Sequence, residues 1–551
     1  MDVSDPPTVT ELLLAQAGNT GPGLLFEDQR WSWQEHVAQC ARYAAALRDR
    51  HTRHPRRTPG PHPFHVGLLA DNVPEFSFLL GGCAFAGAVL VALNPVRRGA
   101  ALAADVARTD CQYVLAEPGY AELLPAGDAN AVPVLPLDSL ELPEQATLDV
   151  VPATADDLLM LIFTSGTSGE PKAVRCTHRK ITAPGRMLVG RYGLTGADTV
   201  YVSMPMFHSN AIMAGWAVGL AAGAAIALRR RFSASGFLAD VRAFGATYAN
   251  YVGKPLSYVL ATPRRGDDAD NPLRIAYGNE GAPGDLARFA ERFGCQVIDG
   301  FGSSEGGVSV ARTPGTPPGA LGQLTDGVAI LNPETGLRCP PARFSPAGEL
   351  LNPDEAVGEI VNTEGAGLFV GYYNDPDADA SRIRDGMYWS GDLGYVDASG
   401  FCWFAGRSGE WLRVDGENLG TAPVERVLLR HPAIAEAAVY GVPNTIGDQM
   451  MACIVLRGGA SLTPEEFGGF LFSQGDLGPR QLPRFVRVTA RLPRTPTFKA
   501  LTRALAAQRW NTTDPVWWRP DVRGESPPYV LLDPEQASAL DTEIGARRPR
   551  P

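Results

Sequence analysis

A loop of small residues, TSGTSGEPK from Thr164 to Lys172, is the part of this chain best suited to chemistry. Glycine and small hydroxyl side chains leave the backbone N–H groups free to converge on an anion, and Lys172 adds a positive charge. The composition therefore predicts a phosphate-binding nest, although such a loop is also typical of a flexible turn. Its spacing does not fit the Walker motif G-x-x-x-x-G-K-[ST].

Five further segments carry side chains that could complete a site around a phosphate. They are DGFGSSE (299–305), GNE (278–280), SGD (390–392), GR (406–407) and RTPTFK (494–499). Mg²⁺ takes oxygen ligands, usually one or two carboxylates with substrate phosphates, so Glu305 is a candidate metal ligand. Each residue also has a plainer interpretation: Glu305 as a turn residue, Asp392 as a cap, and Arg407 and Lys499 as surface charges.

In order and approximate spacing, these segments resemble the motifs of the adenylate-forming superfamily, which includes acyl-CoA synthetases, firefly luciferases and peptide-synthetase adenylation domains. The resemblance implies an ATP- and Mg²⁺-dependent enzyme. Its nucleotide site would contain Thr164, Ser165, Gly166, Thr167, Ser168, Gly169, Lys172, Gly278, Asn279, Glu280, Phe301, Gly302, Ser304, Asp392, Arg407 and Lys499.

The same resemblance implies a role for individual side chains. Residues 278–280 would line the adenine edge, Phe301 would stack on adenine, and Ser304 would contact phosphate. Asp392 would accept hydrogen bonds from both ribose hydroxyls, and Arg407 would contact ribose and phosphate.

Lys499, Glu305 and Thr167 form the implied catalytic set, in which Glu305 and Thr167 hold Mg²⁺. When a carboxylate attacks the α-phosphorus of ATP, two anions approach each other and pyrophosphate leaves. The metal, the loop amides and a lysine neutralise the charge that develops on the oxygens. Losing one such donor typically costs on the order of 3–4 kcal/mol in the barrier. No side chain is needed as a nucleophile.

The segment SMPMFH, which ends at His208, resembles the Pro-x-Phe-His motif of acyl-CoA synthetases. The stretches around Tyr251, Gly253 and Gly416 look like the fatty-acid-transport-protein and very-long-chain acyl-CoA synthetase branch, and like actinobacterial fatty-acid–CoA ligases. By this resemblance, these four residues would border the acyl and CoA sites. The implied enzyme converts a long- or very-long-chain acid and ATP to acyl-AMP and pyrophosphate, then transfers the acyl group to CoA. The sequence leaves open the chain length and the choice of a sterol-derived acid.

Apolar strand-like runs alternate with helical patterns, which predicts an α/β fold of layered sheets and helices. The predicted strands are His65–Leu69, Ala88–Ala92, Tyr113–Leu115, Leu158–Phe163, Thr199–Ser203 and Arg274–Tyr277. After Arg407 the pattern changes to a smaller α+β unit, with predicted strands at 437–440, 452–456 and 485–488 and a capping box from Thr463 to Glu466.

We predict three parts from these patterns. Residues 1–406 form a large N-terminal domain that binds ATP and the acyl group. Residues 407–513 form a small, mobile C-terminal lid that carries the catalytic lysine, and residues 514–551 form a tail. Gly409 would act as the hinge, because glycine permits large changes in φ and ψ.

The bulk properties favour a globular protein of the cytoplasm. A chain of 551 residues exceeds a single domain, and its net charge of −11 argues against a nucleic-acid partner. Eight scattered cysteines with no C-x-x-C pair predict reduced thiols, and the first residues predict no secretory signal. The oligomeric state does not follow from the sequence.

One apolar run, Ala211–Leu228, is just long enough to span a membrane and is followed by Arg229, Arg230 and Arg231. Its alanine and glycine content favours a buried helix followed by a buried strand. A weak peripheral association with the membrane stays open, since a lipid substrate would reside there.

Three other functions compete with a CoA ligase. Residues Gly302–Gly306 satisfy the hydrolase motif G-x-S-x-G, but His431 is the only histidine downstream. A lipid uptake or transport protein would fit the apolar runs, but it would not need Glu305, Asp392, Arg407 and Lys499. A fatty-acyl-AMP ligase would instead load a separate acyl carrier protein.

Overall fold

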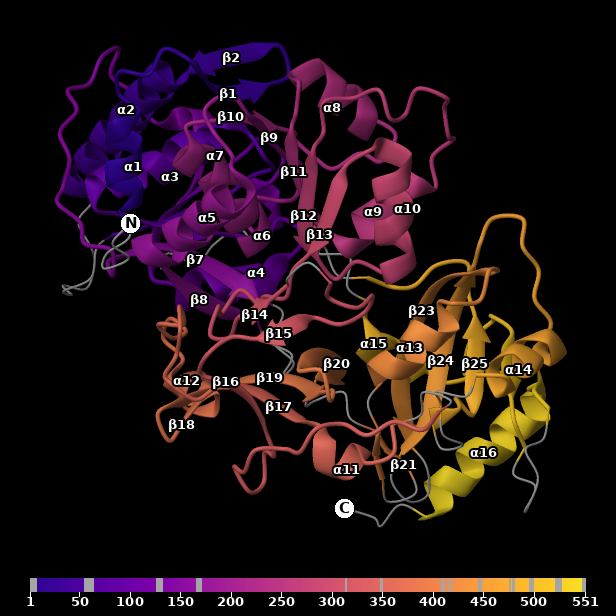
Figure 1. The fold of residues 1–551 in the computed structure, drawn as a ribbon. Helices are drawn as coiled ribbons and strands as arrows, with labels where there is room; N and C mark the ends of the chain where they lie inside the picture. Colours follow the sequence, from indigo (N-terminus) through magenta and orange to yellow (C-terminus); the bar gives the residue numbers. More distant parts are fainter. Residues whose placement is uncertain are drawn as a thin grey trace. The chain divides into compact units, whose positions relative to one another are not determined.

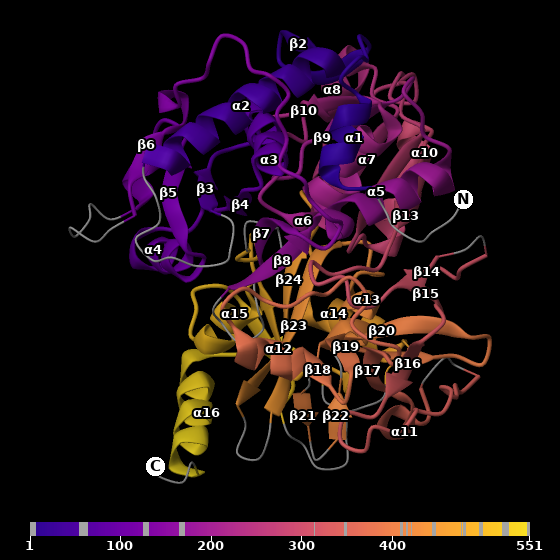
Figure 2. The same cartoon turned by 90° about the vertical axis from the view of Figure 1, so that its left-hand side faces the viewer.

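The structure of the chain is a computed structural model, drawn as a ribbon in Figures 1 and 2. It describes residues 7–53, 64–124, 132–164, 171–312, 315–346, 350–407, 412–414, 417–419, 421–443, 448–474, 477, 481–494, 500–520 and 528–547. Contacts within the chain divide it into two compact units. Unit 1 comprises Met1–Gly307 and Ala366–Gly386, and unit 2 comprises Val308–Gly365 and Met387–Pro551.

Unit 1 contains two largely parallel sheets. The first has the strand order β13-β12-β11-β9-β10-β1-β2, in which only β1 and β2 run antiparallel. Its strands are β1 (Pro22–Phe26), β2 (Gln29–Ser32), β9 (Thr199–Val202), β10 (Ala225–Leu228), β11 (Tyr248–Val252), β12 (Ile275–Asn279) and β13 (Gln296–Asp299).

The second sheet has the order β6-β5-β3-β4-β7-β8, with β7 and β8 antiparallel and the rest parallel. Its strands are β3 (His65–Leu69), β4 (Val89–Ala92), β5 (Cys111–Ala116), β6 (Val134–Pro136), β7 (Leu158–Thr164) and β8 (Lys172–Thr177). Apart from Leu158 and Thr164 at its ends, β7 is buried throughout, as expected of a strand in a sheet covered on both faces.

Helices fill the space between these sheets and cover the outer face of the first (Figures 1 and 2). Those between the sheets include α3, which packs on β4 and β7, α5, which packs on β8, and α7, which packs on β9 and β10; α5 also packs on α7. The helices of unit 1 are α1 (Val9–Ala15), α2 (Trp33–Arg53), α3 (Pro74–Ala86), α4 (Gly99–Arg108), α5 (His178–Tyr192), α6 (Ser209–Ala211), α7 (Ala217–Ala222), α8 (Phe237–Phe244), α9 (Gly253–Leu260), α10 (Pro283–Phe293) and α12 (Pro376–Arg382).

The apolar run 211–228 forms the predicted buried helix and strand. It continues α6 through a π-helical turn (Ile212–Trp216) into α7 and ends in β10. Gly185 lets α5 and α7 approach each other closely, because a Cβ at this position would lie 2.7 Å from the backbone of Ala217, the first residue of α7. Within the described parts of the chain, no helix has both the length and the apolar character needed to cross a bilayer.

Unit 2 is built mainly on antiparallel strands, with one parallel pair, β24 and β25. One sheet has the order β14-β15-β20-β19-β17-β16, a second has the order β23-β24-β25-β26-β27, and β21 pairs with β22. These strands are β14 (Val310–Ala311), β15 (Gly322–Leu324), β16 (Val328–Leu331), β17 (Gly358–Asn362), β19 (Met387–Val396), β20 (Phe401–Arg407), β21 (Leu412–Val414), β22 (Glu417–Leu419), β23 (Ile434–Pro443), β24 (Asp448–Leu456), β25 (Phe485–Val488), β26 (Val516–Trp518) and β27 (Val530–Leu531). The helices are α11 (Pro353–Ala356), α13 (Thr421–Leu428), α14 (Pro464–Phe472), α15 (Thr502–Gln508) and α16 (Pro534–Arg547).

The predicted α/β class and the predicted strands are confirmed, and the Thr463–Glu466 capping box begins α14. All eight cysteines are free thiols, as predicted. The segment after residue 513 differs from the expected tail, because β26 and β27 extend the sheet of unit 2 and Tyr529 is buried in its core. The two compact units do not divide between residues 406 and 407. The boundary that we predicted there, between the large domain and the mobile lid, therefore stays a prediction.

Candidate active site

The predicted phosphate-binding loop connects two antiparallel strands. β7 ends at Thr164 and β8 begins at Lys172, and these residues face each other as the final pair of the ladder. Thr164 Oγ1 is buried and has no hydrogen-bond partner among the described residues. The hairpin therefore holds a hydroxyl with unused hydrogen-bonding capacity and a lysine at the two ends of one loop. The other predicted loop residues, Ser165, Gly166, Thr167, Ser168 and Gly169, lie outside the described residues.

The predicted metal ligand Glu305 lies in an irregular segment after β13 and is only 9% exposed. The Tyr372 hydroxyl donates a hydrogen bond to Glu305 Oε1 at 2.9 Å, and Arg382 Nε donates a hydrogen bond to Tyr372 Oη at 3.4 Å. Lys180 Nζ donates to the backbone carbonyl of Glu305 at 2.7 Å. Both the side chain and the main chain of Glu305 are therefore fixed by distant parts of unit 1.

These partners also set the charge of Glu305. Burial alone would raise the pKa of this carboxyl group. The positive charge of Arg382, the Tyr372 hydroxyl and the Lys180 ammonium outweigh burial, so the pKa of Glu305 lies below its ordinary value. The side chain is an anion at neutral pH, which is the state that a hard cation requires of its ligand.

Tyr372 reaches Glu305 because residues 371–373 run alongside β8. Arg175 N donates to Gly371 O at 3.1 Å, and Tyr373 N donates to Ala173 O at 2.8 Å. Gly371 has φ 101°, and a Cβ there would lie 2.8 Å from an Asp379 carboxylate oxygen. Position 371 therefore requires a glycine. The turn that this glycine permits directs Tyr372 toward Glu305.

The predicted adenine edge lies where β11 and β12 end side by side. A Cβ on Gly278 would lie 2.2 Å from Tyr251 O, and one on Gly253 would lie 1.7 Å from Glu280 O. These glycines are therefore required by the close approach of two backbones. Asn279 Oδ1 is buried with no hydrogen-bond partner among the described residues, and Glu280 has φ 62°.

The predicted acyl-side residues meet the predicted phosphate-side residues through hydrogen bonds. Ser209, directly after His208, shares a hydrogen bond of 2.7 Å between its Oγ and Ser304 Oγ. Asn210 Nδ2 donates to Tyr251 O at 3.0 Å. The Tyr251 hydroxyl donates a hydrogen bond of 2.9 Å to Asp299 Oδ1, at the end of β13. Tyr251 therefore links β11 to the end of β13 beside the site.

Phe301 and Gly302 precede this cluster in the irregular segment. Phe301 is half-buried, whereas Gly302 is exposed and no atom lies within 4 Å of the Cβ it lacks. Residues 301–309 contain no helix, so Ser304 does not occupy the strand–turn–helix elbow that a G-x-S-x-G hydrolase requires. Its hydroxyl partner is Ser209, which is not a base.

In unit 2, the predicted ribose contacts are neighbours. Asp392 of β19 pairs directly with Arg407 of β20 in the antiparallel ladder. Asp392 is buried, and Gly391 N beside it donates to Glu359 Oε1 at 2.6 Å. The ladder explains how residues from two sequence motifs come together. Gly416 and Lys499 lie outside the described residues.

Sequence reasoning missed four residues of this network: Lys180, Ser209, Tyr372 and Arg382. Lys180 was hidden because a lysine near a helix start usually lies at the surface. Gly371 was a usable signal for a turn, since glycine is a preferred turn residue, but nothing in the sequence indicated that Tyr372 would face Glu305.

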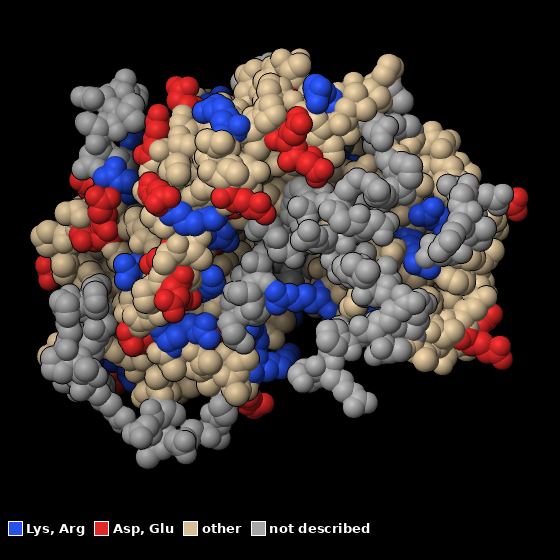
Figure 3. Space-filling model, turned by 90° about the horizontal axis from the view of Figure 1, so that it is seen from below, with Lys and Arg blue, Asp and Glu red and all other residues tan. Residues whose placement is uncertain are grey.

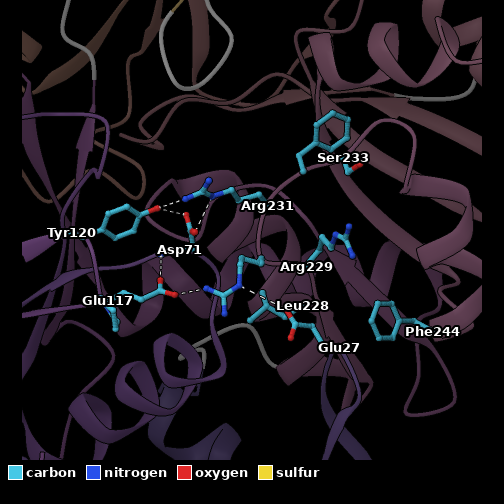
Figure 4. A pocket seen from close by; sticks show the side chains of 12 residues that line it. Glu27, Asp71, Glu117, Tyr120, Leu228, Arg229, Arg231, Ser233 and Phe244 are labelled. Atoms are coloured by element: carbon cyan, nitrogen blue, oxygen red, sulfur yellow. Dashed lines mark hydrogen bonds and ion pairs between the residues drawn. The ribbon is translucent and has the colours of Figure 1, made fainter. Parts of the chain in front are cut away.

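A pocket of about 610 Å³ lies away from these residues, where β1, β3, β5 and β10 end (Figure 4). Its three arginines each face a carboxylate: Arg229 contacts Asp240, Arg230 contacts Glu117, and Arg231 contacts Asp71. Because the charges pair, the pocket carries no excess positive charge for an anion. Asp71 and Glu117 follow strands of the second sheet and the arginines follow a strand of the first, so the Arg230–Glu117 and Arg231–Asp71 pairs tie the sheets together. On the face drawn in Figure 3, acidic and basic side chains are likewise intermingled.

The close approach at Gly253 leads to a stability prediction. We expect Gly253→Ala to lower the free energy of unfolding by about 2–3 kcal/mol, because the Glu280 backbone must move to admit the methyl group. Gly284→Ala is the matched control, since nothing lies within 4 Å of its Cβ position in α10 and alanine favours a helix. Denaturant unfolding measures both variants. Equal stability of the two would contradict the packing argument.

Comparison with known proteins identifies the family. Residues 15–373 match the model of the AMP-binding enzyme family, and residues 423–499 match that of the AMP-binding enzyme C-terminal domain. The chain is 53% identical over 522 residues to a medium/long-chain-fatty-acid–CoA ligase (FadD17) of Mycobacterium marinum, covering 94% of this chain and 99% of that protein. It is 43% identical over 541 residues to a steroid-22-oyl-CoA synthetase of Rhodococcus jostii, covering 96% of each.

Solved structures share the fold. The anthranilate CoA ligase AuaEII, in complex with anthranoyl-AMP, superposes with a TM-score of 0.77 at 20% identity and covers 92% of this chain and 98% of its own. The O-succinylbenzoate CoA synthetase of Bacillus subtilis, with ATP and magnesium, superposes with a TM-score of 0.73 at 24% identity and covers 90% and 98%. The chain belongs to the AMP-binding enzyme family, within the adenylate-forming superfamily that its motifs resemble.

Proposed function

We propose that this protein is an AMP-forming fatty-acid–CoA ligase. It activates a carboxylic acid with ATP to acyl-AMP and pyrophosphate, and then transfers the acyl group to CoA. The observation that carries the proposal is the buried Glu305, held by Tyr372 and Lys180 where the superfamily has its metal ligand. The names of its mycobacterial relatives support a medium- or long-chain fatty acid as substrate.

The residues present fit ATP and Mg²⁺. Thr164 Oγ1 and Asn279 Oδ1 are buried polar atoms with no partner among the described residues, and a bound nucleotide would satisfy them. Glu305 supplies the anionic oxygen for the metal, together with Thr167. Bound Mg²⁺ would supply charge neutralisation at the phosphate oxygens.

The protein's own groups then perform the rest of the chemistry. The 164–172 loop and Lys172 bind the phosphates, Phe301 packs on adenine, and Asp392 with Arg407 orients the ribose. Lys499 donates to the oxygens that gain charge as the carboxylate attacks the α-phosphorus. His208, Tyr251 and Gly253 border the acyl group, and Gly416 borders CoA.

A sterol-derived acid is the second candidate substrate, because a relative that covers 96% of this chain is named a steroid-22-oyl-CoA synthetase. A separate acyl carrier protein is the alternative acceptor to CoA. A pyrophosphate-release assay over acids of graded length and a steroid acid, with and without CoA, tests both points. Release that depends on a fatty acid, with a CoA thioester as product, is the expected result. Release with a steroid acid alone, or a thioester formed only on a holo-carrier protein, would replace the proposal.

We propose that the enzyme acts in the cytoplasm, with at most a weak peripheral association with membranes. Flotation of the full chain with liposomes tests this proposal. We expect the protein to stay in the dense fraction at physiological salt.

Motion at Gly409, which lies outside the described residues, is the next prediction. We expect the small domain to rotate between an adenylating pose, with Lys499 inward, and a thioester-forming pose, with residues 413–416 inward. Gly409→Pro should restrict the hinge, because proline fixes φ near −65°. Thioester formation should fall at least tenfold more than ATP–pyrophosphate exchange. An equal loss of both half-reactions would argue against the hinge.

A further inference from the structure

Lys180 is a buried cation on helix α5, and its burial needs an explanation. The residue is 1% exposed and lies on the buried face of the helix with Ile181, Gly185 and Leu188. Lysines are almost never fully buried unless they are paired, because removing an ammonium group from water is costly. The group that Lys180 pairs with is therefore expected to be one that the fold must hold in a fixed position.

That partner is the main chain of Glu305. Lys180 Nζ donates to Glu305 O at 2.7 Å, across 125 residues of sequence. The ammonium group also lies 5.9 Å from the centre of the Phe369 ring, which packs edge-on against Tyr372. Lys180 thus contacts both the metal-ligand candidate and Phe369, which packs on Tyr372.

The surrounding backbone shows why this contact would matter. Gly306 has φ 68°, and Leu368 N donates to Gly306 O at 3.0 Å. Lys180 therefore anchors the carbonyl at 305, and segment 366–386 anchors the next carbonyl. With the main chain held at these two points, the Tyr372 hydroxyl at 2.9 Å orients the Glu305 carboxylate. The hydrogen bond of Lys180 goes to this main chain and not to the carboxylate, on which Lys180 acts through its charge.

We propose that Lys180 is a positioning residue for Mg²⁺·ATP, which holds the Glu305 main chain so that the carboxylate can meet the metal. The proposal rests on the adenylation function proposed above. Residues that orient a metal ligand from behind typically contribute 10–100-fold to metal affinity or activity. Lys180 should act on metal-dependent nucleotide binding and leave the acyl and CoA sites unchanged.

Lys180→Met tests this role, because methionine fills similar space without a donor or a charge. Isothermal titration of the full chain with ATP and MgCl₂ should show a Kd about 10–100-fold weaker than in the unmodified protein. The Kd for AMP in EDTA, which needs no metal, should stay within about twofold of the unmodified protein, as should the KM values for fatty acid and CoA. The Mg²⁺ concentration for half-maximal pyrophosphate release should rise in parallel.

Arg179→Met is the matched control, since Arg179 is the preceding residue of the same helix and pairs with Asp156 near the surface. It should bind Mg²⁺·ATP like the unmodified protein. Lys180→Arg keeps a donor and a charge, and should recover part of the affinity. If Lys180→Met does not fold, Lys180→Gln retains a neutral N–H donor and should show a smaller weakening in the same direction.

Unchanged Mg²⁺·ATP binding in Lys180→Met, or in Lys180→Gln if that variant is needed, would overturn the proposal. An equal loss of AMP binding would also overturn it, because such a loss indicates a general structural role. The unmodified protein is titrated first. If it does not bind Mg²⁺·ATP, adenylation itself is wrong, which is a different result from a silent substitution at Lys180.

Discussion

Lys499→Ala should nearly abolish acyl-adenylate formation, with a rate loss of roughly 10²–10³-fold, while leaving the use of pre-made acyl-adenylate largely intact. In the adenylating step, negative charge develops on the oxygens around the α-phosphorus, and a preorganised lysine stabilises it. Removing such a donor costs on the order of 3–4 kcal/mol, which corresponds to a rate loss of roughly 10²–10³-fold. The second half-reaction breaks the mixed anhydride with a thiol and, in the proposed cycle, takes place after the lid has rotated Lys499 away.

The two half-reactions separate this effect from misfolding. ATP–pyrophosphate exchange reports the first, and thioester formation from synthetic acyl-AMP and CoA reports the second. We expect Lys499→Ala to lose the first and keep most of the second, and Arg503→Ala, four residues on at the start of α15, to keep both. Adenylation by Lys499→Ala at the unmodified rate would contradict the role assigned to Lys499.

Glu305→Gln should lower kcat/KM for ATP by roughly 10²–10³-fold, the size of a lost electrostatic contribution to a transition state. Glutamine has nearly the same shape and its carbonyl can still accept the Tyr372 hydroxyl, so the substitution removes mainly the charge. Arg382 and Lys180 hold the pKa of Glu305 below its ordinary value, so the carboxylate stays ionised as the pH falls from 8 to 5. We therefore expect no acidic limb from this residue in that range.

Tyr372→Phe is the companion variant to Glu305→Gln. It removes the hydroxyl that orients the carboxylate and leaves the charge, so its loss should be smaller, about tenfold, and higher Mg²⁺ should restore part of it. Pyrophosphate release against Mg²⁺ concentration measures both variants. If Glu305→Gln kept the unmodified dependence on Mg²⁺, Glu305 would not be the metal ligand.

Several features could be predicted from the sequence because they depend on local rules. The strand before Thr164 follows from a continuous apolar run, and the start of α14 follows from Thr463 and Glu466, which cap each other within one turn. The residue types of the nucleotide motifs also follow from chemistry, since phosphate, ribose and a hard cation each need particular donors or oxygens. The local secondary structure and the chemical types of the site residues could therefore be predicted from the sequence alone.

The structural reasons for individual glycines could not be predicted from the sequence. Gly278 and Gly253 were expected from their motifs as lining residues, yet the structure gives each a backbone carbonyl 2.2 and 1.7 Å from the Cβ position. This constraint arises between neighbouring strand ends, where chain segments 27 residues apart meet. The second unit shows the same principle, since Asp392 and Arg407 become a pair through strand register.

By itself, the sequence determined the family, the fold class and the chemical types around a nucleotide, because these depend on short strings and periodic patterns. Only the tertiary structure decided which groups support them. A lysine near a helix start is expected at the surface, and only the packing of α5 places Lys180 Nζ against Glu305 O. Tyr372 likewise gains its role from the path of residues 371–373 along β8. Such support comes from contacts between residues distant in the chain, which propensity and spacing do not encode.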